Sequence, residues 1–187
     1  MKRPRRGWFA CLAALLLLTT ATWGQRHRDP FTPAEIDQIR DASWEPQQRL
    51  SLYLKFARGR LVALEQMRSD PKTKDRAQQT HDRLDDFLLI YDELNDNVDN
   101  YSERKNDIRK PLKLIIDADT EFQAKLLALR DAANVPAEEA NKYEFILSNA
   151  LDTLDTSAED HHKLLAEQEE VAKHGKKFEK AKSGKSE

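Results

Sequence analysis

The stretch AQQTHDRLDDFLLIYDELNDNVDNY, residues 77–101, decides the fold class of this chain. Two series of largely apolar residues run through it at seven-residue spacing: Ala77, Leu84, Tyr91 and Val98, and three positions later Thr80, Phe87, Leu94 and Tyr101. Such spacing over more than three repeats predicts a long α-helix that buries one seam against neighbouring helices. The run Leu88-Leu89-Ile90 widens the seam, so this helix is either the most central in a bundle, as we expect, or part of a dimer face.

Three further segments carry helical patterns of the same kind. Apolar residues alternate four and three apart in residues 47–67, recur every seven in residues 108–133, and define a last long helix from about residue 140. This spacing places them on one face of each helix. The expected core positions are Leu50, Leu54, Ala57, Leu61 and Leu64, then Ile108, Leu112, Ile115, Phe122, Leu126, Leu129 and Ala133, and finally Ala140, Tyr143, Leu147, Ala150, Leu151 and Leu154.

Prolines mark the breaks between these segments, at Pro71, Pro111 and Pro136. The breaks are short, so consecutive helices are expected to run antiparallel. Pro111 leaves two alternatives open, because the helix can begin near Lys110 or can start earlier and be kinked at the proline.

A short helix is expected ahead of the long ones, in FTPAEIDQIRDA, residues 31–42. Thr32 can cap the first turn, Pro33 suits the first helical position, and Glu35 can hydrogen-bond back to the capping residue. The sequence therefore predicts an all-α fold, an up-and-down antiparallel bundle of about four long helices preceded by a short N-terminal helix, with coiled-coil-like packing. A solenoid of stacked helix pairs is the alternative.

The first 24 residues have the organisation of a signal peptide. MKRPRRGW is basic, FACLAALLLL is apolar but too short for a comfortable membrane span, and TTATWGQ suits cleavage after Ala21 or Gly24. The expected organisation is a signal peptide at residues 1–24, a helical bundle domain at 25–172 and a lysine-rich disordered tail at 173–187. The protein is then periplasmic or secreted, and meets a membrane only if the signal segment is retained as an anchor.

Removal of this segment excludes several function classes. Cys11 lies within it, so residues 25–187 contain no cysteine for a disulfide, a thiolate metal ligand or a nucleophile. Lys2, Arg3, Arg5 and Arg6 also leave with it, so 31 basic residues fall to 27 against 33 acidic ones, a net charge of −6. This charge argues against nucleic acid as a partner.

His161 is the histidine that faces an apolar seam, within about 40° of its centre by helical phase. Glu159 and His162 form a Glu-x-x-His motif of the kind found in di-metal bundles, but Glu159 points outward, so such a centre is not expected. Counting residues along antiparallel helices sets three carboxylates level with His161. The candidate site for a divalent cation is therefore His161, Asp96, Asp99 and Asp107, the alternative being a hydrogen-bonded histidine at a bundle end.

No catalytic constellation is found in the sequence, which lacks a Gly-x-Ser-x-Gly elbow, a His-Glu-x-x-His motif and a glycine-rich phosphate loop. The adjacent acids Asp85-Asp86 and Glu138-Glu139 are explained as a helix surface and a helix start. Met67 lies far from His161 along the bundle, so a haem held between them is not expected, and no cofactor is predicted.

These observations predict a non-enzymatic protein. The leading hypothesis is an exported interaction or structural module of the cell envelope, which engages another protein, or a second copy of itself, through exposed helix faces or the lysine-rich tail. The alternative is a periplasmic small-ligand or metal-binding carrier with its site between the helices near His161.

Overall fold

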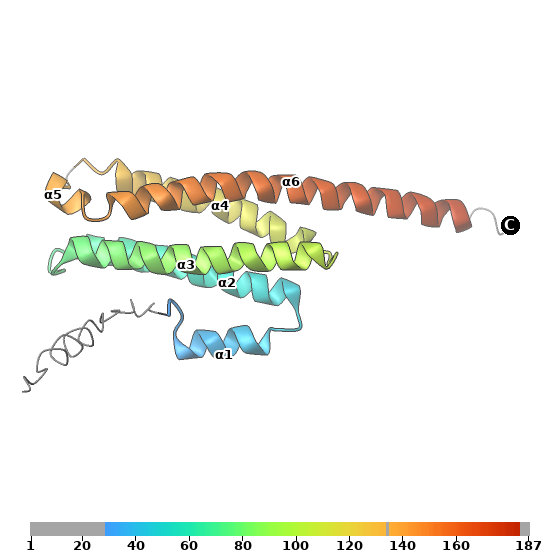
Figure 1. Ribbon diagram of the computed structural model, residues 1–187, viewed down its shortest axis with the longest axis horizontal. Coiled ribbons are helices and arrows are strands. Elements are labelled where there is room, and N and C mark those ends of the chain that lie inside the picture. The colour runs from blue at the N-terminus through green and yellow to red at the C-terminus, as the bar shows by residue number, and fades with distance from the viewer. Residues whose placement is uncertain (1–28, 134, 184–187) are drawn as a thin grey trace, which may run out of the picture.

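Figure 1 shows the computed structural model, which describes residues 29–133 and 135–183, with side chains to residue 174. These residues form α1 (Pro33–Asp41), α2 (Pro46–Ser69), α3 (Arg76–Glu103), α4 (Arg109–Arg130), the single turn α5 (Ala137–Ala140) and α6 (Glu144–Ser183). The four long helices pack against one another, so the predicted all-α bundle with a short preceding helix is confirmed. The predicted signal peptide, residues 1–24, lies outside the described residues.

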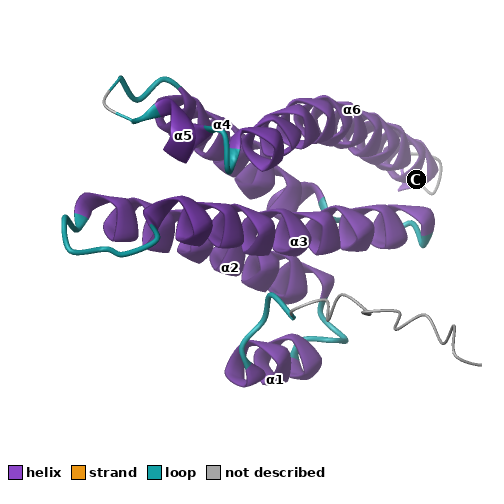
Figure 2. Cartoon of the chain, turned by 60° about the vertical axis from the view of Figure 1, so that its left-hand side comes forward, coloured by secondary structure: helices purple, strands orange, loops and turns teal. Residues whose placement is uncertain are grey.

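The bundle consists of two helical hairpins stacked as two layers. Figure 2 shows α2 and α3 together in one layer and α4 and α6 in the other, with α1 against the outer side of the first layer. Contacts of α2 with α4 and of α3 with α6 join the layers, which leaves α3 and α4 on a diagonal. Side chains from α3 and α4 consequently meet in the centre, where the Phe122 ring lies 5.4 Å from that of Phe87 and 6.3 Å from that of Tyr91.

The core follows the seven-residue seams closely. All eight expected seam residues of α3 and all five of α2 are buried. Leu88 and Ile90 are buried within the single chain as well, which supports the central position expected for α3. Ala133 is an error of the prediction: α4 ends at Arg130, so the seam stops there and Ala133 is exposed in the following loop.

Helix α1 is fastened to α2 through its N-terminal cap. Thr32 and Glu35 form the predicted capping box, with the Thr32 backbone N–H donating to Glu35 Oε2 at 2.8 Å. The Arg60 guanidinium also donates to both Glu35 oxygens, at 2.9 and 2.6 Å. Burial alone would raise the pKa of Glu35, but the hydrogen bonds from Arg60 and Thr32 outweigh it and hold this pKa below its ordinary value. Phe31 adds edge-on contacts with the rings of Tyr53 and Phe56.

The connection between α3 and α4 is a tight reversal. Lys105 has a φ of 60°, and its N–H donates to the Ser102 carbonyl while the Asn106 N–H donates to that of Tyr101. This pairing is a Schellman motif, in which a left-handed residue ends a helix and satisfies its last carbonyls. Pro111 is the third residue of α4, where its missing N–H costs no helical hydrogen bond, so the helix begins near Lys110 and needs no kink at the proline.

At the opposite end, Glu139 of α5 joins two helices. Its carboxylate accepts hydrogen bonds from Arg76 at 3.0 and 2.9 Å and from Arg68 at 3.2 Å. The hydrogen bonds from Arg76 hold the pKa of Glu139 below its ordinary value, with a further contribution from the charge of Arg68. The residue thus does more than begin a helix, because it ties α5 to α2 and α3.

Helix α6 differs from expectation at its C-terminal end. Its backbone remains helical through Ser183, across the start of residues 173–187, which the sequence predicts to be a disordered tail. Lysine, which has high helix propensity, occupies five of the eleven positions in residues 173–183. An ion pair of 2.7 Å between Lys173 and Glu170, three residues apart, adds to the helical preference.

Candidate functional site

His161 lies in the middle of the bundle and is paired with a carboxylate. Its Nδ1 is 2.8 Å from Oδ2 of Asp119 on α4, and the Tyr91 hydroxyl of α3 donates to the other oxygen, Oδ1, at 2.7 Å. Asp119 and His161 are each 3% exposed and Tyr91 is fully buried. A carboxylate only accepts hydrogen bonds, so Nδ1 of His161 must carry a proton in this arrangement.

This network is satisfied internally. Burial raises the pKa of the Tyr91 hydroxyl far above its ordinary value, reinforced by the charge of Asp119 and the hydrogen bond to it, while a hydrogen bond with Ser157 acts in the opposite direction. Tyr91 is therefore held as a neutral donor. Each oxygen of the Asp119 carboxylate accepts one hydrogen bond, which suits a structural role in fixing how α3, α4 and α6 meet.

The structure does not bring His161 together with the carboxylates predicted to share an ion with it. Asp96 and Asp99 are exposed on α3, and Asp107 is exposed before α4. Asp107 instead forms a fork with the Arg109 guanidinium at 2.8 and 2.6 Å, and the hydrogen bonds from Arg109 lower the pKa of Asp107 to about 2. Within the described side chains, no three His, Cys, Asp or Glu residues are grouped so as to hold a metal ion.

The sequence contains a signal for the acidic partner of His161, namely a polar residue at a heptad position that is otherwise apolar. Asp119 stands seven residues after Leu112 and seven before Leu126, so it is a polar residue in a core position of the 108–133 pattern. Asp86 is a second buried carboxylate: it is 6% exposed, although the sequence predicts that it lies on a helix surface. The position of His161 along the bundle axis was predicted wrongly, because the separate turn α5 precedes α6 and the last long helix begins only at Glu144. Counted from Glu144, His161 lies about 26 Å along α6, level with Tyr91.

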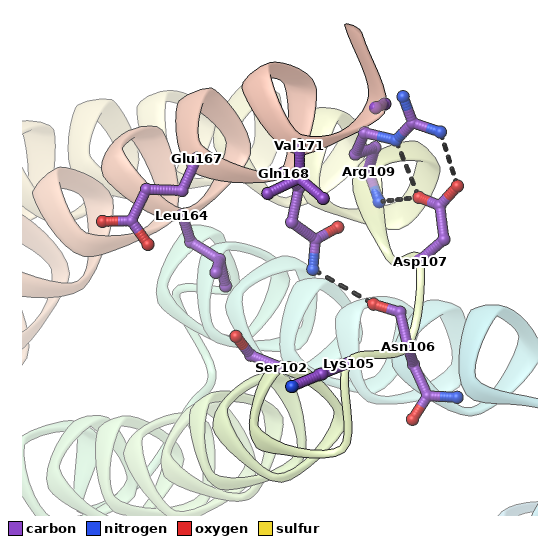
Figure 3. A pocket seen from close by; sticks show the side chains of 10 residues that line it. Ser102, Lys105, Asn106, Asp107, Arg109, Leu164, Glu167, Gln168 and Val171 are labelled. Atoms are coloured by element: carbon purple, nitrogen blue, oxygen red, sulfur yellow. Dashed lines mark hydrogen bonds and ion pairs between the residues drawn. The ribbon is translucent and has the colours of Figure 1, made fainter. Parts of the chain in front are cut away.

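A cleft opens at the end of the bundle where the α3–α4 connection meets α6. It has a volume of about 610 Å³, and Figure 3 shows side chains of α6 bordering it from above and those of the connection from below. Leu164, Val171 and Ala172 supply apolar surface, and Ser102, Lys105 and Glu167 supply polar groups. Val171 is 73% exposed, and Phe145 near the start of the same helix is 86% exposed.

Gln168 closes the inner side of this cleft. Its side-chain nitrogen donates to the Asn106 carbonyl at 3.1 Å (Figure 3), and its side-chain oxygen accepts from the Ile108 N–H at 3.1 Å. Ile108 is the N-cap of α4 and makes no side-chain cap hydrogen bond, so Gln168 of α6 supplies the acceptor that the first turn requires. Lys113 also pairs with Glu169 at 3.0 Å, and these contacts set the height at which α6 leaves the bundle.

Beyond these contacts α6 continues past the other helices. In Figure 1 its C-terminal part projects beyond the ends of α2, α3 and α4. We call residues 173–183 the overhang; eleven residues of helix correspond to about 16 Å of length.

The comparisons with known proteins add no assignment. No family model, no curated protein and no solved structure matches this chain. A search of the described residues for a helix with the length and apolar character to cross a membrane also finds none.

Proposed function

We propose that this protein is an exported, non-enzymatic interaction module of the cell envelope, and that the C-terminal part of α6 is the surface that engages its partner. The observation that carries this proposal is the projection of α6 beyond the bundle, with the exposed Val171 at its base. A helix outside its own bundle gains no stability from tertiary packing, which normally supplies most of the stability of a helix in water. A binding partner would supply that packing.

The arrangement of α6 also favours this role over catalysis. Gln168 and Glu169 anchor the helix on the α4 side, so the projecting part leaves the bundle in a defined direction. At the cleft, Asp107 and Arg109 are paired with each other in a fork of two hydrogen bonds. An apolar strip with a charged rim is the usual composition of a protein-binding surface.

Site-specific photo-crosslinking in the native cells tests the proposal. The photoreactive residue p-benzoylphenylalanine at position 171 should yield a crosslinked product in the envelope fraction. The same residue at position 162 is the matched control, because His162 is exposed on α6 but lies within the length of the bundle. Absence of any product at position 171, or equal products at both positions, would count against the overhang as the binding surface.

Export is tested separately by the mass of the protein recovered from the native cells. Cleavage after Ala21 or Gly24 should produce a chain that begins at Thr22 or Gln25 and fractionates with the envelope or the medium. A full-length chain in the cytoplasmic fraction would contradict the localisation and leave the interaction surface to be tested by crosslinking alone.

The carrier hypothesis is not proposed for the region around His161. Asp119 and Tyr91 already occupy this part of the core, and the buried rings of Phe87 and Phe122 pack beside Tyr91. A ligand there would have to displace hydrogen bonds to a buried carboxylate, at a cost of several kcal/mol (~3–5).

A further inference from the structure

A polar pocket lies where the α1–α2 connection meets the C-terminal turns of α3. Figure 1 shows that this connection reaches α2 at the end of the bundle where α3 also ends. The pocket has a volume of about 330 Å³, and its polar lining comes from Ser43 in the connection, Arg49 on α2, and Asp96, Asn97, Asn100 and Arg104 at the end of α3. None of its lining residues belongs to α6, so the pocket is separate from the overhang.

Two guanidinium groups border this pocket without a carboxylate partner. Within the described part of the chain, neither Arg49 nor Arg104 forms an ion pair, whereas arginines elsewhere in the bundle, such as Arg60, do. Asp96 borders the same pocket but is paired with neither of them. With Asp96 as its one acid, the lining has a formal net charge of +1, in a chain whose residues 25–187 carry a net charge of −6.

Arg49 is held in place by a neighbouring tyrosine and retains unused donors. Its Nη2 donates to the Tyr53 hydroxyl at 3.2 Å, and its guanidinium carbon lies 5.7 Å from the centre of the Tyr53 ring. Its Nε is buried and finds no acceptor among the described residues. Buried N–H groups of native proteins are nearly always hydrogen-bonded. The guanidinium of Arg49 therefore has both charge and donor capacity that the chain itself does not use.

We propose that this pocket binds a phosphate group, with Arg49 and Arg104 as the pair of cationic ligands. The planar fork of a guanidinium matches two oxygens of a phosphate, and hydrogen bonds between these two charged groups are among the stronger ones in proteins. The Ser43 hydroxyl and the Asn100 amide border the pocket as further donors. A tetrahedral anion with four oxygens can accept from several sides of a pocket, whereas a carboxylate offers two oxygens in one plane.

Asp96 determines which tetrahedral anion fits the pocket. An ionised carboxylate only accepts hydrogen bonds, so it repels an anion that carries no proton and can accept a hydrogen bond from one that carries a hydroxyl group. Inorganic phosphate has at least one P–OH group at neutral pH, and sulfate of the same shape has none. The pocket should therefore prefer phosphate to sulfate.

Isothermal titration calorimetry at constant ionic strength tests this preference. The chain used is residues 25–187, which contain every described residue and the whole buried core. Inorganic phosphate should bind, and sulfate should bind about tenfold more weakly or not at all, since it leaves the Asp96 carboxylate without a donor. Asp96→Asn should bind sulfate as well as phosphate, because an amide can donate to either anion.

Arginine variants test the two cationic ligands. Arg49→Gln and Arg104→Gln should each weaken phosphate binding by about tenfold or more, because a charged donor is lost. Arg130→Gln is the matched control, since Arg130 is an exposed arginine paired with Asp131 at the other end of the bundle, and it should leave the affinity unchanged. Arg104 is exposed, so Arg104→Gln should keep the circular dichroism of the parent even if Arg49→Gln unfolds.

Trp44 distinguishes dissolved phosphate from the phosphate of a lipid headgroup. It follows Ser43 directly, is 91% exposed and is the only tryptophan in residues 25–187. Vesicles of phosphatidylcholine with phosphatidic acid should shift its fluorescence to shorter wavelength if the pocket takes a headgroup, because tryptophan at a membrane surface leaves water. Dissolved phosphate should leave the emission wavelength nearly unchanged.

The outcomes are distinct from those of the proposed function. Phosphate binding that Arg104→Gln weakens and Arg130→Gln does not supports a site for a dissolved phosphate, and a response to phosphatidic acid vesicles alone assigns the pocket to a headgroup. No response to either probe, or equal affinities for the parent and Arg104→Gln, overturns the inference. Equal binding of sulfate and phosphate by the parent overturns the assignment to phosphate. Crosslinking at position 171 tests the overhang independently, since the pocket contains no residue of α6.

Discussion

Replacing His161 with leucine should destabilise the protein strongly. Asp119 is 3% exposed, and its two oxygens accept one hydrogen bond each, at 2.8 Å from His161 and 2.7 Å from Tyr91. Leucine is close to histidine in volume, so the substitution leaves little cavity and isolates the loss of the donor. Removing one partner of a buried charge typically costs about 3–5 kcal/mol, and that is the change expected in the free energy of unfolding.

Two further variants distinguish this explanation from a simple packing defect. Tyr91→Phe removes the second donor but keeps the first, and should cost about 1.5–3 kcal/mol, the range for a hydrogen bond to a charged group. The triple variant Tyr91→Phe, Asp119→Leu, His161→Leu removes the carboxylate together with both donors. Because no charge is then buried without a partner, its stability should return close to that of the parent chain or exceed it.

Urea unfolding followed by far-ultraviolet circular dichroism measures these changes, provided that the slope with denaturant is the same for all variants. His162→Leu is the matched control, because His162 is exposed, and should change the stability by no more than about 0.5 kcal/mol. A cost below about 1 kcal/mol for His161→Leu would mean that water reaches Asp119 and would refute the reasoning. A triple variant as unstable as His161→Leu would assign the effect to packing instead.

Three more predictions follow from the remaining contacts. Glu35→Ala should lower the free energy of unfolding by about 1–3 kcal/mol and increase hydrogen exchange in α1, because the cap and the hydrogen bonds to Arg60 are both lost. Asp37→Ala is the control and should lower it by less than about 0.5 kcal/mol, because Asp37 belongs to an exposed ion pair. Glu139→Ala should cost about 1–2 kcal/mol and expose the α5 segment to proteolysis. Because the pKa of Tyr91 is raised in the folded protein, the contribution of Tyr91 to the free energy of unfolding should be complete below about pH 10 and decline above it by up to about 1.4 kcal/mol per pH unit. Urea titrations of Tyr91→Phe should lack this decline.

The heptad pattern was sufficient to predict many of the core positions. Side chains seven apart on a helix share a face, so the seam residues of α2 and α3 could be identified from spacing alone, and all of them are buried. The capping box at Thr32 and Glu35 was equally predictable, because both partners lie within one turn of the chain. Seam spacing and helix capping both depend on residues close in sequence, so they can be predicted without knowing how the helices are arranged.

The contacts of His161 were not predictable in the same way. Its burial followed from helical phase, but its partner depended on how far α6 is shifted along α4, and the interposed turn α5 changes that shift. Asp96, Asp99 and Asp107 therefore appeared level with His161 when residues were simply counted, and they lie exposed instead. An error of a few residues in one connection moves a helix by several ångströms (~1.5 Å per residue), enough to exchange one carboxylate for another.

The sequence by itself determined that the chain is helical, which face of each helix is buried and where the breaks fall. Only the tertiary structure decided that α3 and α4 face each other across a diagonal, that Asp119 joins Tyr91 to His161, and that α6 projects beyond its neighbours. The physical reason is that helix formation and seam burial follow from interactions within a turn or two. The relative heights of the helices follow instead from the summed packing of all four and from the length of each connection.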